Sequence, residues 1–136
     1  MTKAGSTVGS GAVVVCDERA CMLDMALNAV RFFRNESCGK CVPCRVGSSK
    51  LTDLLTAWTR GEHGPQDGQL VDDLTHALKL TSICGLGQVV PVPIASVTTH
   101  FQDEVEAHLT MRRCAAGVCF AAAGAPGGPA GPGKQH

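Results

Sequence analysis

Two features are scarce in this chain of 136 residues: an excess of charge of either sign, and long apolar runs. Twelve basic and twelve acidic side chains cancel without forming blocks, so the composition favours neither a nucleic-acid surface nor an anionic membrane surface. No stretch approaches the roughly twenty apolar residues of a transmembrane helix. The segment 1–6 lacks the apolar core of a secretory signal. These absences make membrane insertion unexpected and a cytoplasmic location the default expectation.

Cysteine, by contrast, is abundant, with eight residues. In a short secreted chain this number would indicate a disulfide scaffold, but the spacing here is typical of metal ligation in a reducing cell. Cys38, Cys41 and Cys44 are separated by two residues each, and Cys84 follows much later. A [4Fe–4S] cubane needs this arrangement, because one tight turn can supply three thiolates while a remote cysteine supplies the fourth.

Two other interpretations of these four cysteines remain open. Four thiolates can hold structural zinc, although such sites usually combine two pairs of cysteines rather than three plus one. A disulfide framework would require strained loops between cysteines so close in sequence. The pattern therefore favours the iron–sulfur cluster over both.

Hydrophobic periodicity predicts a mainly α fold, a small four-helix bundle around a buried cluster, with one short strand before it. The strand is expected at 9–16, where a glycine turn enters a β-branched run that must pair with another sheet. Helices are expected over 20–35, from the cluster turn to 60, over about 69–81, and from 94 to about 109 after an extended proline corner at 91–93. The apolar faces of the first two helices are expected to contain Met22, Met25, Ala26, Ala29, Val30 and Phe33, then Val46, Leu51, Leu54, Leu55 and Trp58.

The chain length allows one modest domain. We expect a flexible amino terminus over 1–8, an iron–sulfur-binding helical domain over 9–120, and a disordered Ala/Gly/Pro tail over 121–136 that has little apolar surface to bury. Lys40, Arg45 and the backbone amides at the start of the second helix add positive charge near the cluster. They would favour its reduced form and raise its potential. Gly85 and Gly87 would let the backbone approach it.

The runs 36–47 and 82–87 resemble the iron–sulfur-binding region at the carboxyl end of the flavin-bearing, 51-kDa-type NADH dehydrogenase subunit. That family includes respiratory complex I, NAD-linked formate dehydrogenases and bidirectional hydrogenases. The resemblance covers about 9–119 and implies a helical bundle whose [4Fe–4S] cluster accepts electrons from flavin and passes them onward. The segment 114–119 resembles the Cys-Pro-Ala-Gly-Val-Cys element of the formate dehydrogenase and hydrogenase branch, with Ala115 in place of proline.

The sequence departs from that family in having no glycine-rich phosphate loop and no flavin motif. We therefore expect FMN and NAD on a partner chain, and no catalysis by this chain alone. It is interpreted as an electron-relay component, separately encoded or a detached fragment. Its expected partners are a flavin- and NAD-binding subunit and other iron–sulfur subunits.

A second metal site is suggested by the remaining cysteines. Cys114 and Cys119 form a Cys-x4-Cys loop, and one more thiolate with an imidazole would complete tetrahedral zinc. Cys21 is the preferred third ligand and His108 the fourth, with His100 as a competitor for the imidazole. The alternative is that these are reduced thiols packed as small hydrophobes. Cys16 is expected to be structural.

Three function classes follow from these patterns. The first is an electron-transfer subunit carrying one [4Fe–4S] cluster in an NAD(H)-linked oxidoreductase. The second is a zinc-stabilised interaction module with no redox role. The third is a thiol-redox enzyme with Cys38 or Cys114 as nucleophile, for which the sequence offers no thioredoxin-like context.

Overall fold

The structure is a computed structural model that describes residue 11 and residues 13–120, and every described regular element in it is a helix. The expectations of a flexible segment at 1–8 and a disordered tail at 121–136 concern residues outside that range. The helices are α1 (Met22–Asn35), α2 (Val42–Arg60), α3 (Asp67–Thr81), α4 (Gly85–Val89), α5 (Val92–His100) and α6 (Gln102–Met111). The mainly helical fold class is thereby confirmed.

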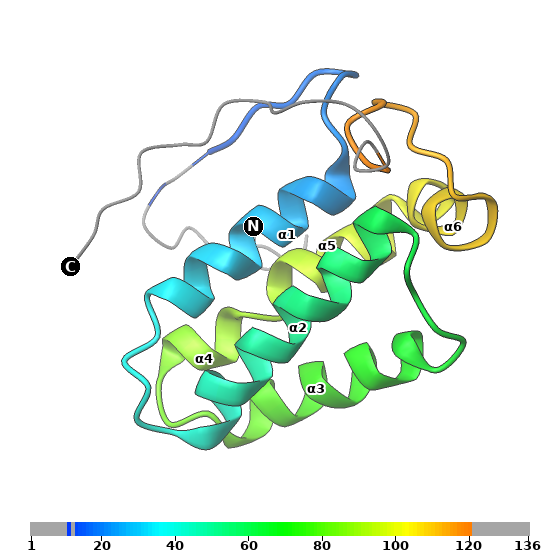
Figure 1. Cartoon of the computed structure of the whole chain (residues 1–136). Helices are drawn as coiled ribbons and strands as arrows, with labels where there is room; N and C mark the ends of the chain where they lie inside the picture. The colour runs from blue at the N-terminus through cyan, green and yellow to red at the C-terminus, as the bar shows by residue number, and fades with distance from the viewer. Residues whose placement is uncertain (1–10, 12, 121–136) are drawn as a thin grey trace, which may run out of the picture.

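Helix α2 lies at the centre of the molecule, with α1 running in the opposite direction along one side and α3 packed on another (Figure 1). Helix α5 packs against α1, and the short α4 contacts both α2 and α3. Each long helix turns one apolar face to this centre because burial of that face supplies most of its stability. The most enclosed core side chains are Leu23, Leu27, Val30, Leu51, Leu55, Leu78, Val90 and Ile94.

The buried face of α1 is rotated from the predicted one. Ala26 and Val30 are buried as expected, but Met22 and Met25 are only half-buried. Leu23 and Leu27 are fully buried instead. Leucines and methionines are interleaved along this helix. Periodicity alone therefore does not decide which of two adjacent apolar faces is buried.

The predicted strand is wrong for the part of 9–16 that the structure describes. Val13, Val14 and Val15 belong to no strand and are 83%, 71% and 91% exposed. A β-branched run becomes a strand only when a second strand satisfies its backbone groups, and none is present among the described residues. Residues 9, 10 and 12 lie outside the described range.

The prediction of one continuous fourth helix is also wrong. It is broken at Phe101, whose backbone (φ −129°, ψ 42°) ends α5 and begins α6. The proline corner is not extended either, because Pro91 is helical (φ −75°, ψ −14°) and α5 starts directly after it with Pro93 in its first turn. Helix α4 is an addition to the predicted elements. None of the described helices combines the length and apolarity that a bilayer crossing requires.

Candidate metal centres

The four cysteines of the cubane pattern occupy the end of the molecule where α1 ends and α2 and α4 begin (Figure 1). Cys41 is the residue immediately before α2, and Cys44 lies in its first turn. Cys84 is the residue immediately before α4. The unpaired backbone amides of a helix start carry partial positive charge, so the longer helix α2 provides a favourable environment for an anionic group at this end.

Two contacts join the α1–α2 turn to the turn that carries Cys84. The backbone amide of Ile83, followed by that of Cys44, donates to the thiolate of Cys41 and lowers the pKa of that thiol. Gly87 approaches the side chain of Cys44 so closely that a Cβ on the glycine would lie 3.0 Å from the cysteine Cβ. The fold therefore brings Cys41, Cys44 and the segment that carries Cys84 close together.

The tight turn before α2 depends on glycine. Gly39 has φ +73°, a left-handed conformation that side chains with a Cβ rarely adopt. Its amide donates to Ser37 Oγ at 3.3 Å, and the same Oγ lies 3.4 Å from Cys44 Sγ. The turn therefore brings polar hydrogens toward the sulfur of Cys44.

The expectation that helices enclose the bound cluster remains a prediction, and two of its four proposed ligands lie at the surface of this chain. Cys44 is buried and Cys41 half-buried, but Cys38 and Cys84 are exposed. Lys40 and Arg45 are exposed as well, and their predicted influence on the potential remains a prediction. The cluster end therefore presents Cys38 and Cys84 at the surface of this chain.

The donor chemistry of this end fits a cubane. It offers four free thiols and backbone donors, and Gly87 lets the backbone of α4 approach Cys44 closely. Thiolates hold [4Fe–4S] clusters, and nearby hydrogen-bond donors tune their reduction potential. These sulfurs are not gathered tightly enough to share one metal ion. A cubane holds its thiolates farther apart than a single ion does, so this is the expected distinction between the two kinds of site.

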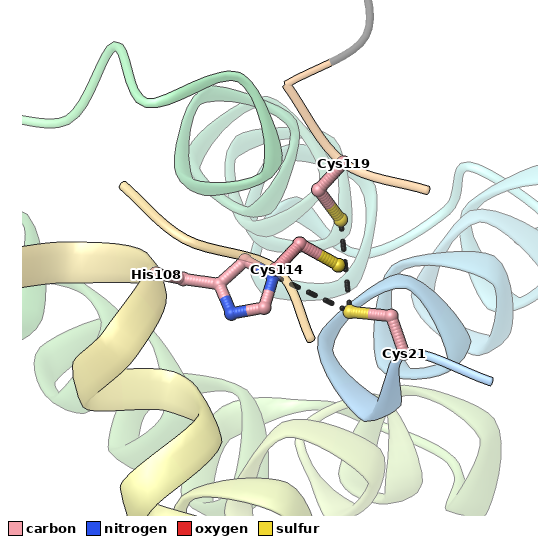
Figure 2. Close-up of side chains that lie close together, drawn as sticks. All are labelled: Cys21, His108, Cys114 and Cys119. Atoms are coloured by element: carbon pink, nitrogen blue, oxygen red, sulfur yellow. Dashed lines mark hydrogen bonds between the residues drawn. The ribbon is translucent and has the colours of Figure 1, made fainter. Parts of the chain in front are cut away.

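A second group of ligands is gathered tightly. Figure 2 shows the sulfurs of Cys21, Cys114 and Cys119 and the imidazole of His108 directed toward a common point. Their ligand atoms all lie within 4.8 Å of one another, and in the described part of the chain no other such group shares a single-ion site. Three thiolates and one imidazole form a donor set typical of structural zinc. The other imidazole candidate, His100, is exposed at the end of α5 and does not belong to this group.

Three separate segments place these four side chains. Cys21 is the residue before α1, and His108 lies in the last turn of α6. After α6 the chain reverses at Arg112, which has φ 48°, and the amide of Arg113 donates to the Ala107 carbonyl at 3.0 Å. The returning segment is held at its far end by the Phe120 amide, which donates to the Thr59 carbonyl of α2 at 3.0 Å. The Cys-x4-Cys loop is thus fixed on both sides.

The imidazole of His108 is oriented for ligation. It is completely buried, and its Nδ1 lies 2.7 Å from the Glu104 carbonyl oxygen. A carbonyl oxygen only accepts, so Nδ1 must carry the hydrogen and Nε2 presents its lone pair. Nε2 lies 3.4 Å from Cys21 Sγ. A hydrogen bond from the second ring nitrogen to a carbonyl is the usual way in which a metal-binding histidine is held.

The thiols of this group differ in their ease of ionisation. The Cys119 thiol donates to Cys21 Sγ at 3.6 Å, which lowers the pKa of Cys21 against the opposing effect of burial. The same interaction, together with burial and the nearby sulfurs, raises the pKa of Cys119. Cys21 therefore loses its proton more readily than Cys119, and a cation would be needed to hold several thiolates together.

Sequence reasoning missed several residues at both ends. Glu104 accepts a hydrogen bond from the Met22 amide at 2.8 Å and so caps α1 next to Cys21. Ser37, Ser82 and Ile83 surround Cys41 and Cys44. The serines flank the cysteines in sequence, which is a weak signal, but the role of Glu104 is not visible without the fold. Cys16, expected to be structural, is exposed.

Comparison with known proteins decides the family. Residues 24–108 match the model of the NADH-ubiquinone oxidoreductase-F iron-sulfur binding region. This chain belongs to that family. The resemblance drawn from the cysteine runs is thereby confirmed.

Relatives agree with this assignment. Over 116 residues, 85% of this chain, it is 42% identical to the NADP-reducing hydrogenase subunit HndC of Solidesulfovibrio fructosivorans, covering 24% of that protein. It is 30% identical to the mitochondrial NADH-ubiquinone oxidoreductase 51 kDa subunit of Neurospora crassa, over 76% of this chain and 21% of the relative. The crystal structure of an NAD+-reducing [NiFe]-hydrogenase in the H2-reduced state superposes with a TM-score of 0.68 at 31% identity, over 71% of this chain and 17% of that one. The chain thus spans about a quarter of the length of the curated relatives it matches.

Proposed function

We propose that this chain is an electron-transfer component that carries one [4Fe–4S] cluster on Cys38, Cys41, Cys44 and Cys84. The observation that carries the proposal is the close approach of Gly87, three residues after Cys84, to the side chain of Cys44, which brings the segment of the remote cysteine beside the three-cysteine turn. Membership of an iron–sulfur-binding family supports the same assignment. When bound, the cluster supplies one-electron chemistry, since it accepts and releases single electrons.

The chain's own residues bind and orient the cluster. Cys38, Cys41 and Cys84 reach it from turns, while Cys44 reaches it from the first turn of α2. Amide donors at Cys41 favour a negatively charged centre. The exposure of Cys38 and Cys84 leaves one side open to another protein, which shortens the distance over which an electron must pass.

The proposed partners are a flavin- and NAD-binding subunit on one side and further iron–sulfur subunits on the other. Relatives named as subunits of a hydrogenase and of an NADH-ubiquinone oxidoreductase support partner subunits in general. A formate dehydrogenase or hydrogenase type of complex, with FMN and NAD on another chain, is the specific form that we propose. Eight free thiols suit the reducing cytoplasm.

The test is metal analysis of the full chain purified and reconstituted without oxygen. Iron and acid-labile sulfide should each be close to four per chain, and the dithionite-reduced protein should give the EPR signal of a reduced cubane. Zinc in place of iron, with no labile sulfide after reconstitution, would overturn the proposal and support the zinc-stabilised interaction module. Binding of iron without a cubane signal would also contradict it.

We also propose that Cys21, His108, Cys114 and Cys119 hold a structural zinc ion. Support comes from their 4.8 Å grouping and from the lone pair that His108 directs at Cys21. Zinc has no redox chemistry, so its role would be to fix the returning segment to the start of α1 and the ends of α2 and α6. The two centres lie at opposite ends of α2, where Cys44 and Thr59 are separated by about 22 Å at a rise of 1.5 Å per residue.

The zinc proposal is tested by counting zinc in the protein that also holds iron. One zinc per chain, retained when the cluster is removed and lost in a Cys114→Ser variant, is the expected result. The matched control is Cys16→Ser, which removes an exposed cysteine outside both groups. Zinc content that does not depend on Cys114 would overturn the assignment.

A further inference from the structure

Cys44 is the most enclosed of the four cysteines in the proposed cluster site, with 4% of its surface exposed. Water therefore has little access to its sulfur, and the surrounding protein must supply whatever hydrogen bonds the sulfur receives. Two serine hydroxyls are candidates: that of Ser37, in the turn before α2, lies beside the sulfur, and that of Ser82, at the end of α3, lies on the same side of Gly87 as the Cys44 side chain.

Ser37 is oriented as a donor to this sulfur. Its Oγ accepts the Gly39 amide hydrogen at 3.3 Å, so a lone pair is occupied and the hydroxyl hydrogen is free to point elsewhere. Cys44 Sγ lies 3.4 Å from the same Oγ. The thiolate of a cluster-bound cysteine is an acceptor only, and the hydroxyl is then the donor.

Ser82 presents a hydroxyl for which the described residues offer no partner. Its side chain is 5% exposed, and its Oγ is buried without any hydrogen bond in the described part of the chain. Buried hydroxyls are almost always paired, because an unpaired one loses its hydrogen bonds to water without replacement. The Ser82 hydroxyl is therefore available to donate a hydrogen bond to a group bound beside it.

The position of Gly87 shows where that hydroxyl lies. A Cβ on Gly87 would meet Ser82 Oγ at 2.5 Å and Cys44 Cβ at 3.0 Å. The hydroxyl and the Cys44 side chain thus converge on the same side of this glycine. Ser82 also lies only two residues before Cys84 in the sequence.

We propose that Ser37 and Ser82 donate hydrogen bonds to the Cys44 corner of the [4Fe–4S] cluster and raise its reduction potential. The inference rests on the ligand set proposed above. Uptake of one electron makes the cluster and its thiolates more negative, so an O–H donor stabilises the reduced form more than the oxidised form. No proton is transferred, because the pKa of a serine hydroxyl is too high for the hydroxyl to lose its proton.

The test is a redox titration of the reconstituted full chain, followed by EPR of the reduced cluster. Ser37→Ala and Ser82→Ala should each lower the potential, so that at a fixed potential near the midpoint the ratio of reduced to oxidised cluster falls several-fold. A tenfold fall corresponds to about 59 mV for one electron. Ser37→Thr keeps the hydroxyl and should restore the wild-type ratio. Ser96→Ala, at an exposed serine of α5, should leave it unchanged.

Controls separate tuning from structure and from failure of the ligand assignment. In the metal-free chain Ser82 Oγ makes no hydrogen bond, so Ser82→Ala should unfold at the wild-type temperature or slightly above it. Unchanged potentials in both alanine variants, with four irons and four sulfides present, overturn this inference and leave the proposed function standing. A wild-type chain without a cubane overturns the proposed function itself. A Ser82→Ala chain that folds but binds no cluster assigns Ser82 to holding the cluster, which contradicts a tuning role for it.

Discussion

Cys21 and His108 are 87 residues apart in the sequence, yet Cys21 Sγ and His108 Nε2 lie 3.4 Å apart in the buried interior. The contact joins the start of α1 to the end of α6. Since a histidine that is completely buried is unusual without a specific partner, this pair is the strongest sign of a ligand site at this end of the fold.

We expect His108→Ala to lose the zinc ion. The loss of one of four ligands leaves an incomplete tetrahedral shell, so zinc affinity should fall by more than about tenfold. The melting temperature of the zinc-loaded chain should fall with it. Zinc titration with a competing chelator and thermal unfolding measure the two effects.

The matched control is His100→Ala, which removes an exposed histidine of the neighbouring helix α5. It should retain wild-type zinc content. If the His108 variant unfolds at a lower temperature only to the extent seen in chelator-treated wild type, the effect is loss of zinc. An equal shift with and without chelator would instead indicate a cavity left by the ring.

Zinc binding should release protons and strengthen as pH rises. The hydrogen bond to Cys21 and burial raise the pKa of Cys119, so this thiol is protonated at neutral pH in the metal-free chain. Zinc binds the thiolate, and the proton must leave. Because the proton and the metal compete, affinity should increase from about pH 6 to pH 8. Calorimetry in buffers of different ionisation enthalpy counts the protons, and a count of zero would exclude Cys119 as a ligand.

Glu104→Ala should destabilise the fold around the same site. The Glu104 carboxylate accepts the Met22 amide hydrogen at 2.8 Å and places negative charge at the positive end of α1. Loss of such a cap costs typically about 1 kcal/mol. Urea unfolding of the zinc-free chain measures it. Glu106→Ala, at an exposed position on the same helix, should change stability by much less.

The two proposed metal sites could be inferred from the sequence because they depend on cysteine spacing. A turn of three cysteines needs only local geometry, and Cys-x4-Cys after a helix leaves few candidates for the remaining ligands. The break at Phe101 was not predictable, because α5 and α6 together carry apolar residues at intervals that also fit one helix. Nor was the exposure of Cys38 and Cys84, since it depends on how the turns that carry them pack against the helices.

Contacts between segments that are distant in the sequence could not be predicted either. Glu104 caps a helix whose first residue lies 82 positions earlier, and no local pattern marks it. The valines at 13–15 show the opposite failure, in which a strong local preference for strand is overridden because no partner strand lies beside them among the described residues.

Gly87→Ala should disturb the cluster end. The added Cβ would lie 2.5 Å from Ser82 Oγ and 3.0 Å from Cys44 Cβ, so at least one of them must move. Overpacking of this kind costs about 1–3 kcal/mol. Cluster content should fall too, because the displaced group is a proposed ligand or its neighbour. Urea unfolding of the metal-free chain and iron analysis after reconstitution test the two effects.

Gly85→Ala is the control for that substitution. Both glycines lie in α4, but a Cβ on Gly85 would meet nothing within 4 Å. Alanine also favours a helix over glycine, so stability should be unchanged or slightly higher. Similar damage from both substitutions would show that α4 tolerates no side chain, and the specific approach of Gly87 to Cys44 would then not be the cause.

Cys84→Ser should abolish or convert the four-iron cluster, because serine oxygen is a poor replacement for the thiolate that supplies the fourth corner. Cys16→Ser removes a cysteine that is also exposed but lies outside the proposed ligand set, so it should leave iron, sulfide and the EPR signal unchanged. Comparing the Cys84 and Cys16 variants is informative because both thiols are exposed, so a difference between the variants cannot be due to exposure. A four-iron cluster that survives unchanged in the Cys84 variant would show that the remote ligand lies elsewhere, and the approach of Gly87 to Cys44 would then serve only the packing of α4 on α2.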